Sequence, residues 1–288
     1  MAEISATVVM KLRKMSGQGM MDCKKALMEA KGDIDKAMEI LRKKGLATLS
    51  KRALRETNEG IVVGKVSEDG KAAVLASLCC ETDFVSKNDD FVNAAAILAD
   101  FAMACPEDEG VENVLETSLD GKKYSDVLTE LVSKTGEKTE VGDYAKYKLE
   151  GPGFIDIYIH FNKKIGAMIE LETNDDSVAE SEQLKEAANG VAMHIAAINP
   201  LALDKDGIAA EVIEQEKVIY AEQVKNKPAN IVDKIVEGKM NKFFAEKCLL
   251  AQHFVKDDSK TVAQVIAAAG KDAGGEAKIK RFVRFGIG

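Results

Sequence analysis

The stretch Gly60–Leu78, GIVVGKVSEDGKAAVLASL, contains two apolar runs separated by a polar segment that ends in Asp-Gly. The runs Ile61–Val66 and Ala72–Leu78 have the composition of strands, and Asp-Gly is a preferred pair in the turn of a β-hairpin. This stretch therefore predicts an antiparallel hairpin. A segment with helical spacing of apolar residues, Phe91–Ala102, follows it and closes before Pro106.

The same order of elements recurs about 91 residues later. Phe154–His160 and Ile165–Leu171 form a second hairpin, after which Glu172-Thr173 stands where Glu81-Thr82 stood in the first copy. A helical segment, residues 184–198, follows again. Two copies of strand, turn, strand, loop and helix predict two related α+β subdomains packed as a pair. Chance similarity is the alternative, because any hairpin followed by a helix shares this coarse pattern.

The first 45 residues indicate three short helices around a small core. Ser5 and Asp33 are suitable N-caps for the first and third helices, because their side-chain oxygens can accept hydrogen bonds from free backbone N–H groups. Gly17 interrupts the first helix, and Gly45 is expected to end the third. Basic residues then follow on a helix-like connector.

Residues 206–250 have a different composition, with apolar residues at helical spacing among Glu and Lys, and with Asn226-Lys227-Pro228 between the two runs. This pattern is typical of an antiparallel helical hairpin that projects from the body. A short helix starting near Ser259 and a last strand, Ile279–Phe285, complete the chain. The expected fold class is α+β, with a helical domain and connector at 1–55, a first core subdomain at 56–148, a second at 149–205 and 251–288, and the helical hairpin at 206–250.

Composition restricts the classes of function. The chain has 40 basic and 48 acidic residues and a net charge of -8, which argues against a nucleic-acid binder that acts through its overall field. No apolar run approaches the ~18 residues that a membrane span requires. The motifs of P-loop hydrolases, of serine hydrolases and of His-Glu-x-x-His metalloproteases are all missing from the sequence.

The cysteines and histidines are expected to be structural. Five cysteines form no C-x-x-C pair and there are three histidines, so we expect no metal site, cofactor or disulfide framework, and a reducing cytoplasm as the location. The adjacent Cys79 and Cys80 lie on a predicted strand, where alternation would place one in the core and one near the surface. His160 and His194 show no metal-ligand spacing and are expected to be packing or contact residues.

Two segments indicate contacts with another protein. Met20 and Met21 cannot both face so small a helical core, so at least one is expected to be exposed as a contact. In Thr82–Val85, Phe84 is either a core residue or an exposed contact. The repeat favours exposure, because the residue 91 positions later is Asp175, and a fold that tolerates Asp there does not require an aromatic side chain.

These segments resemble translation elongation factor Ts of bacteria. The resemblance rests on MMDCKKAL at Met20–Leu27, Gly32-Asp33-Ile34, ETDFV at Glu81–Val85 and the helix around His194, and it extends to RFVRF at Arg281–Phe285. It therefore covers nearly the whole chain. It implies a ubiquitin-associated-like helical domain, a core of two related subdomains and a projecting coiled-coil hairpin.

The resemblance also implies a function. Such a protein is not an enzyme but a guanine-nucleotide exchange factor for the GTPase elongation factor Tu, which it binds in the GDP-bound or nucleotide-free form, promoting GDP release by disturbing the Mg²⁺ and phosphate site. No cofactor, metal, nucleic acid or membrane is implied, and a homodimer is a further option. The residues that match the family motifs are Thr82, Asp83, Phe84 and Val85 for dislocation of Mg²⁺ from the partner, and Leu12, Arg13, Met20, Met21 and His194 for partner binding.

Two other functions stay open at this point. A ubiquitin-associated-like domain also serves adaptors, so the alternative is an interaction module without exchange activity, which would not need Asp83 and Phe84. A catalytic α+β enzyme is the third and weakest option, because the sequence offers no recognisable acid–base pair.

Overall fold

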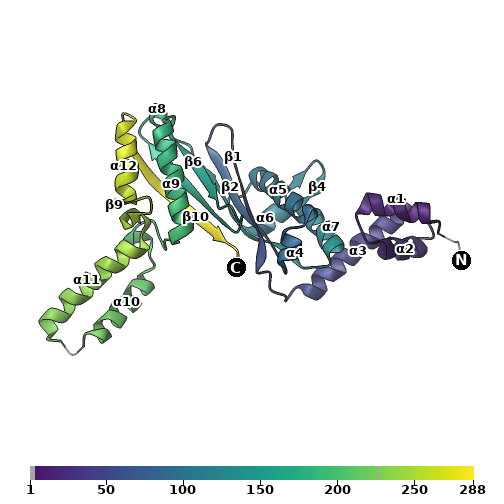
Figure 1. The fold of residues 1–288 in the computed structure, drawn as a ribbon, viewed down its shortest axis with the longest axis horizontal. Helices are drawn as coiled ribbons and strands as arrows, with labels where there is room; N and C mark the ends of the chain where they lie inside the picture. Colours follow the sequence, from purple (N-terminus) through teal and green to yellow (C-terminus); the bar gives the residue numbers. More distant parts are fainter. Residues whose placement is uncertain (1–3, 226) are drawn as a thin grey trace.

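The structure is a computed structural model that describes residues 4–225 and 227–288, so Asn226 of the predicted turn lies outside the described residues. The chain forms an elongated mixed α+β molecule (Figure 1). Three N-terminal helices lie at one end, the sheets and their helices form the body, and a pair of helices projects from the other end. The predicted α+β class is confirmed.

The N-terminal helices are α1 (Ala6–Ser16), α2 (Met20–Glu29) and α3 (Ile34–Arg52). The predicted caps are present, because the Ser5 and Asp33 side chains accept hydrogen bonds from backbone N–H groups of the first turns of α1 and α3. Buried apolar side chains of the three helices form a small core of their own.

The prediction that the third helix ends at Gly45 is wrong, since α3 continues to Arg52. At Gly45 this helix lies against α7 (Tyr124–Thr135). A Cβ atom on Gly45 would lie 2.6 Å from the carbonyl oxygen of Thr129, closer than such atoms can approach. The glycine therefore permits close packing of two helices instead of terminating one.

The first sheet has the strand order β1-β2-β5, with all pairs antiparallel. The predicted hairpin forms β1 (Glu59–Val66) and β2 (Ala72–Cys80), and the predicted helix is α5 (Asp89–Ala104). The third strand, β5 (Thr139–Lys148), was not predicted. The remaining elements of this part are α4 (Asp83–Ser86), α6 (Val111–Glu116), β3 (Ser118–Leu119) and β4 (Lys122–Lys123).

The second sheet has the order β10-β7-β6, again antiparallel. Its strands are β6 (Gly153–Ile159), β7 (Ile165–Thr173) and β10 (Ala277–Gly286). The helix expected near Ser259 begins later, because Ser259 belongs to a strand and Thr261 is the N-cap. The associated helices and strands are α8 (Asp176–Ala179), α9 (Glu182–Ile198), β8 (His253–Phe254), β9 (Asp257–Thr261) and α12 (Val262–Asp272).

The two sheets share strand order and register, with an offset that differs from the predicted one. Ile61 pairs with Leu78 as Phe154 pairs with Leu171, so the second hairpin follows the first by 93 positions (61 to 154, 78 to 171). In each sheet a third strand then joins the second strand of the hairpin. The offset of 91 is therefore wrong, because it was read from a Glu-Thr pair that recurs two residues out of register.

The corrected register changes the residue that corresponds to Phe84. Thr82 caps α4 and Asp175 caps the equivalent helix α8, so Phe84 corresponds to Ser177 and not to Asp175. Ser177 is exposed, like Phe84. The conclusion drawn from the repeat stands on the new pair, since this architecture again accepts a small polar residue at that position.

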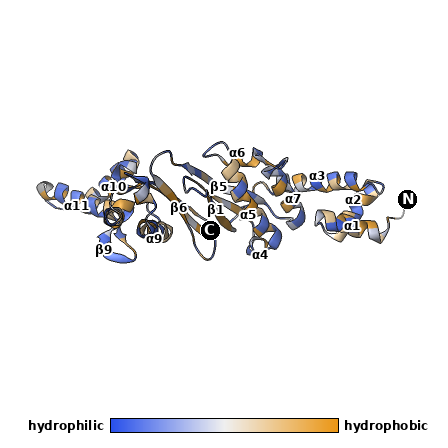
Figure 2. Ribbon diagram, turned by 90° about the horizontal axis from the view of Figure 1, so that it is seen from above, coloured by the Kyte–Doolittle hydropathy of each residue, from blue (hydrophilic) through white to orange (hydrophobic). Residues whose placement is uncertain are grey.

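The body consists of layers, with helices on the outer faces of two sheets that pack against each other. Helices α5 and α7 cover one face of the first sheet, and α9 and α12 cover the far face of the second. Between the sheets, Ala73 and Leu75 of β2 lie in one apolar cluster with Met168 of β7. Because β2 is covered on both faces, Cys79 and Cys80 are both buried, and the expectation of one near the surface is wrong. Hydrophobic residues are prominent on the central strands in Figure 2.

The projecting helices are α10 (Ala210–Gln223) and α11 (Ala229–Lys247), which pack side by side (Figure 1). Short 3-10 helices, Lys205–Gly207 and Leu249–Ala251, lead into and out of the pair. An isolated β-bridge between the backbones of Ala202 and Cys248 joins the two ends of the helix pair at its base. The boundaries given above for four domains stay a prediction.

Candidate partner-binding surface

The Thr82–Val85 segment comprises the N-cap and the first three residues of the short helix α4, and it is fixed at the N-cap. The Thr82 backbone N–H donates to Glu137 Oε2 at 3.1 Å, and its hydroxyl donates to Glu137 Oε1 at 2.8 Å. The same hydroxyl oxygen accepts from the Val85 N–H at 3.4 Å, as an N-cap does. Val85 packs against the apolar core of the first sheet. The helix is therefore anchored through both of its ends.

Phe84 points away from this anchor into solvent. Its side chain is 84% exposed, whereas the phenylalanine at position 91, seven residues later, is completely buried. An aromatic side chain that stands exposed to water on an anchored helix, with no contact to the core, is typical of a residue that contacts another protein. The reading of Phe84 as a core residue is excluded by this exposure.

Asp83, beside it, is ionised and forms an ion pair. Its carboxylate lies 2.7 Å from the ammonium of Lys87, one helical turn later. The hydrogen bond from Lys87 lowers the pKa of Asp83 from its ordinary value. The segment thus presents a carboxylate and an aromatic ring next to each other on the surface.

Glu81, directly before α4, connects this segment to the N-terminal helices. Its carboxylate accepts hydrogen bonds from Arg52 at 2.6 Å and from Arg55 at 2.8 Å, and from the Lys138 backbone N–H at 2.7 Å. Burial alone would raise the pKa of Glu81, but these three bonds outweigh it and lower the pKa to about 2. Glu81 is therefore a fixed negative charge that ties the end of α3 to the end of β2.

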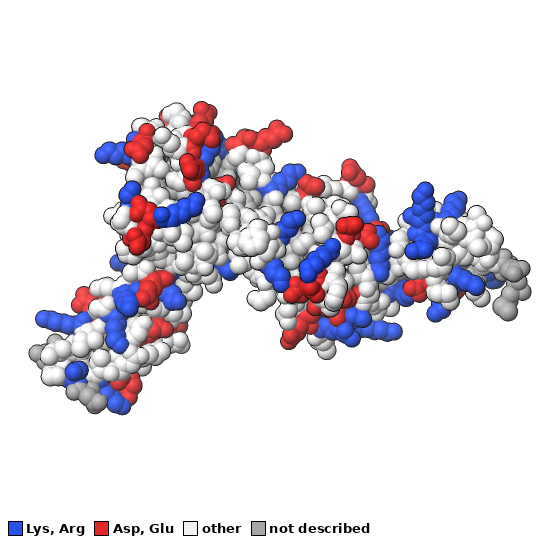
Figure 3. Space-filling view, viewed as in Figure 1, with Lys and Arg blue, Asp and Glu red and all other residues white. Residues whose placement is uncertain are grey.

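The N-terminal helices expose an unusual number of methionines, which we call the methionine surface. Both Met20 and Met21 are exposed, as the sequence predicted for at least one of them. Arg13 is exposed as well, and Lys and Arg predominate over this region on the face shown in Figure 3. Methionine side chains adapt to varied apolar partners, so this basic, apolar face suits a protein contact. The methionine surface comprises Met10, Met15, Met20, Met21 and Met28.

Leu12 differs from Arg13, Met20 and Met21, the other residues predicted to bind a partner on these helices, because it is buried. Its side chain is fully buried in the core of the three N-terminal helices. It is the neighbour of the exposed Arg13 and supports the helix that carries it. A direct contact through Leu12 stays a prediction.

His194 is also buried, and its contact with a partner stays a prediction. One of its ring nitrogens, Nδ1, accepts from the Val255 N–H at 3.2 Å, and Nε2 lies 2.9 Å from Gln252 Oε1. This pattern requires the neutral ring with its proton on Nε2. Burial lowers the pKa of His194, which favours the same neutral form. His194 therefore joins α9 to the segment that follows the projecting helices.

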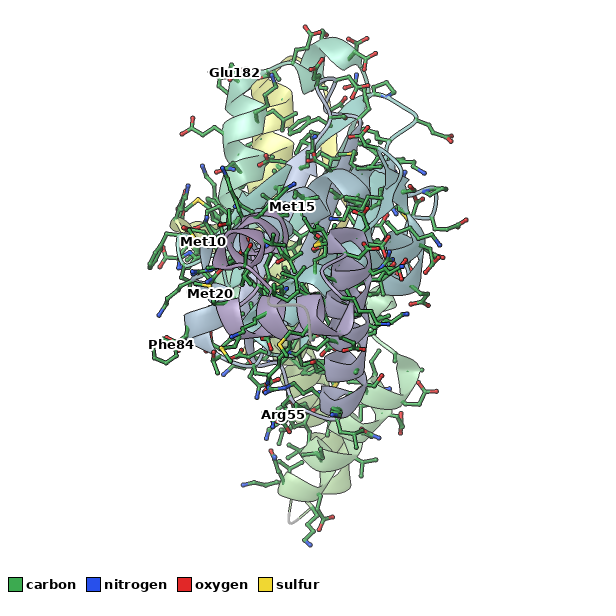
Figure 4. All side chains as sticks on the ribbon, turned by 90° about the vertical axis from the view of Figure 1, so that its right-hand side faces the viewer. Met10, Met15, Met20, Arg55, Phe84 and Glu182 are labelled. Carbon is green, nitrogen blue, oxygen red and sulfur yellow. The ribbon has the colours of Figure 1, made fainter. Side chains whose placement is uncertain are left out.

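Figure 4 shows how the exposed residues lie relative to one another. Viewed from the N-terminal end, Met10, Met20 and Phe84 lie toward the same side of the molecule. His194 belongs to α9, which lies beyond the two sheets as seen from there (Figure 1). The structure thus places Met10 and Met20 on the same side as Phe84, and His194 lies apart from them.

The described residues offer a binding surface and no metal centre. Among them, no group of three or more His, Cys, Asp or Glu side chains could hold a metal ion. In the same part of the chain, no helix has the length and hydrophobicity needed to cross a membrane. All five cysteines are free and buried.

The residues that hold the surface in place were not predicted from the sequence. Glu81 belongs to the quoted ETDFV motif, so its position could have been noticed. Glu137 carries no local signal, because it reaches Thr82 from 55 positions away. Gln18 stands between two glycines, a context that is typical of an exposed loop, but it is only 4% exposed.

The chain is similar in sequence to a known family of proteins. The model of the family described as elongation factor TS matches residues 81–288. A protein named elongation factor Ts from Nitratiruptor sp. is 46% identical over 287 residues, which is 99% of this chain and 93% of the relative. The proteins of the same name from Clostridium perfringens and Desulfovibrio desulfuricans are 44% and 38% identical, over 98% and 99% of this chain and 92% and 98% of their own lengths. The chain belongs to the elongation factor Ts family.

Proposed function

We propose that this protein is the guanine-nucleotide exchange factor for elongation factor Tu in translation elongation, acting in the cytoplasm. Proteins of the elongation factor Ts family are exchange factors and not enzymes. The proposal gives the protein no chemical step of its own. It acts by binding the GTPase in a form that holds GDP and Mg²⁺ poorly.

The observation that carries the proposal is the exposure of Phe84 on an anchored helix. Its side chain is 84% exposed, and the helix is tied to Glu137 and to the core. A free loop would lose conformational entropy when it entered a partner, whereas an anchored helix is already ordered. Phe84 can therefore insert into the GTPase at little entropic cost.

Thermodynamic linkage explains how such insertion releases the nucleotide. If the factor lowers the affinity of the GTPase for GDP, then GDP lowers the affinity of the GTPase for the factor by the same ratio. Phe84 would displace the partner's backbone near its Mg²⁺ and phosphate site, and the adjacent Asp83 would add a negative charge there. Thr82 and Val85 hold the two residues in position, and none of the four needs to bind the metal.

The N-terminal helices provide the second contact in this proposal. They would form a ubiquitin-associated-like domain, residues 1–55, whose Arg13, Met20 and Met21 touch the nucleotide-binding part of the GTPase. Leu12 supports these residues from the helical core. His194 would act indirectly, by fixing the base of the projecting helices against the second subdomain.

The experiment that tests the proposal measures release of fluorescent GDP from elongation factor Tu by stopped flow. The wild-type chain is expected to accelerate release, and Phe84→Ala to lower the maximal rate while binding continues. An adaptor without exchange activity would bind the GTPase and leave GDP release at its spontaneous rate. That second outcome would reject exchange and retain only a binding role.

A homodimer is a further part of the proposal. In the second sheet β10 is an edge strand, and its neighbour β7 pairs with it over nearly its whole length. The open edge of β10 could pair with a second copy. Light scattering of the free protein distinguishes a monomer from a dimer.

A further inference from the structure

Helix α3 connects the methionine surface to the body, which it contacts at Leu41, Gly45 and Arg52. Near its middle, Gly45 lies against α7 so closely that an added Cβ would be 2.6 Å from the Thr129 carbonyl oxygen and 2.9 Å from the Ser133 Cβ. Such an approach is available only to glycine. The contact therefore sets the distance between the two helix axes.

Polar contacts around Gly45 fix the rotation of the N-terminal helices as well. In the amide orientation that satisfies its neighbours, the buried Gln18 donates to the Ser133 carbonyl at 2.7 Å and accepts from the Lys134 N–H at 3.3 Å. The Ser133 hydroxyl donates to the Leu41 carbonyl at 3.1 Å. These bonds join the turn between α1 and α2, and the middle of α3, to the end of α7.

The far end of α3 is held independently. Arg52 and Arg55 both donate to Glu81, whose side chain is 11% exposed, and Glu81 directly precedes Thr82. One helix is thus fixed at its middle to α7 and at its end to the residue before the Phe84 segment. A flexible connector would need none of these contacts.

We propose that the packing of α3 against α7, centred on Gly45, is a positioning device for binding of the GTPase. It holds the methionine surface at a fixed place relative to Phe84, so that the two contacts engage one partner in a single event. Gly45, Gln18 and Ser133 are positioning residues, since Gly45 and Ser133 lie in the interface between α3 and α7, and Gln18 joins the turn between α1 and α2 to α7. The inference rests on the proposed function.

The physical reason is effective concentration. When two contacts lie on one rigid body, binding of the first places the second at its site. With a loose connection, conformational entropy is lost when the second contact forms, and this loss weakens binding. Loss of rigidity should therefore weaken binding, while the maximal rate, which depends on Phe84 once bound, should change little.

The first measurement tests rigidity without any exchange assay. Spin labels on Glu29→Cys, at the exposed end of α2, and Glu112→Cys, on α6, report the distance between the N-terminal helices and the body. The five native cysteines are buried and free, so labelling can be directed to the two new ones. A narrow distance distribution is expected for the parent chain and a broad or displaced one for Gly45→Ala.

The second measurement compares two glycines on helices. Gly45→Ala introduces a Cβ into the contact with Thr129, whereas Gly238→Ala on α11 meets nothing within 4 Å. Both changes add the same atom to a helix interior, so they share the same gain in helix propensity. Gly45→Ala should raise the factor concentration for half-maximal GDP release by ~fivefold or more and keep the maximal rate within about twofold. Gly238→Ala should change neither.

A double-mutant cycle separates positioning from general destabilisation. Met20→Ala should weaken binding in the parent chain but have a smaller effect in Gly45→Ala, because the methionine surface is already uncoupled. A merely destabilised protein would show additive effects. If Gly45→Ala fails to fold, the pair Gln18→Ala and Ser133→Ala replaces it in all three measurements.

The outcomes are decisive for the proposal. A broadened distance with weaker binding, an unchanged maximal rate and non-additivity supports it. A narrow, unshifted distance in Gly45→Ala overturns it, and so does a broadened distance with unchanged half-saturation. If the parent chain accelerates no GDP release at all, the proposed function fails, while the distance measurement still reports whether the helices are rigidly joined.

Discussion

Glu137 binds both hydrogen-bond donors of Thr82, the hydroxyl at 2.8 Å and the backbone N–H at 3.1 Å. A carboxylate only accepts hydrogen bonds, so its two oxygens match the two donors. The bonds connect the segment before β5 to Thr82, which is the N-cap of α4, the helix that carries Phe84. The direction in which Phe84 points therefore depends on a residue far away in the sequence.

Replacing Glu137 should reduce exchange without unfolding the protein. Glu137→Ala leaves the Thr82 N–H and hydroxyl without their partner, which should cost about 1–3 kcal/mol of stability and loosen α4. We expect the maximal rate of GDP release to fall several-fold and the Val85 amide to exchange its hydrogen faster. Glu130→Ala, an exposed glutamate on α7, is the control. Unchanged exchange in Glu137→Ala would mean that α4 needs no such anchor.

Phe84→Ala and Asp83→Ala should each slow catalysed GDP release and leave stability nearly intact. Truncating an exposed side chain typically changes the free energy of unfolding by under ~1 kcal/mol, whereas truncating the fully buried Leu78 should cost about 2–5 kcal/mol. Thermal melts report stability and stopped-flow release of fluorescent GDP reports exchange. If Phe84→Ala melts like Leu78→Ala, or leaves GDP release unchanged while folded, the insertion of Phe84 is not the mechanism.

Met21→Ser and Leu12→Ala should separate contact from support within the N-terminal helices. Met21 is 63% exposed, so its replacement should weaken binding of the GTPase and leave the melting temperature nearly unchanged. Leu12 is fully buried, so Leu12→Ala should destabilise the helices by about 2–5 kcal/mol. Calorimetric titration gives the affinities and circular dichroism the helix content. Equal affinity of wild type and Met21→Ser would remove the methionine surface from the interface.

Local patterns predicted the elements that local physics determines. The caps at Ser5 and Asp33, the two hairpins and the helix α5 follow from hydrogen-bonding side chains, turn residues and periodicity within a few positions. The exposure of Phe84 was also expected, although the residue matched to it in the repeat was wrong. A shift of two positions leaves strand alternation unchanged, so the sequence pattern could not reveal the error.

Features that depend on distant neighbours were missed. Strand β5 contains Gly142 and the buried Lys146, and its pairing with β2 is interrupted by a register shift between Ala76 and Leu78. Lys146 can be buried because its ammonium donates hydrogen bonds to the carbonyls of Met103 and Cys105 at the end of α5, which compensate for the loss of water. Neither a glycine nor a lysine indicates a strand when the sequence alone is considered.

Glu81 should contribute stability that is lost in acid. Its folded pKa, about 2, lies below the ordinary value of 4.5, so its contribution is complete above pH 4.5 and disappears as pH falls toward 2. The shift corresponds to about 3 kcal/mol as an upper value. Glu81→Gln should therefore be less stable than wild type at pH 7, and the two should converge near pH 2. Urea unfolding at several pH values measures this, and a constant difference across the range would contradict it.

His194 should also make the protein less stable as pH falls, since its folded pKa lies below the ordinary value of 6.5. Above pH 6.5 the ring is neutral in both the folded and the unfolded chain, so it adds no pH dependence. As pH falls below 6.5, the unfolded chain binds a proton that the folded chain still excludes, and stability decreases by at most about 1.4 kcal/mol per pH unit. The folded ring resists because a proton on Nδ1 would face the Val255 N–H, which now donates to it.

His194→Gln should therefore be less sensitive than wild type to a change from pH 7 to pH 5. Glutamine cannot be protonated in this range, and the carboxylates common to both chains cancel in the difference between their free energies of unfolding. Urea unfolding at pH 7, 6 and 5 gives that difference. The free energy of unfolding of wild type, relative to that of His194→Gln, should decrease as the pH falls. Only wild type has an imidazole that the folded state keeps neutral and the unfolded state protonates. A difference that stays constant, or grows toward pH 5, would show that the buried ring does not exclude a proton and that the Val255 bond does not set its charge.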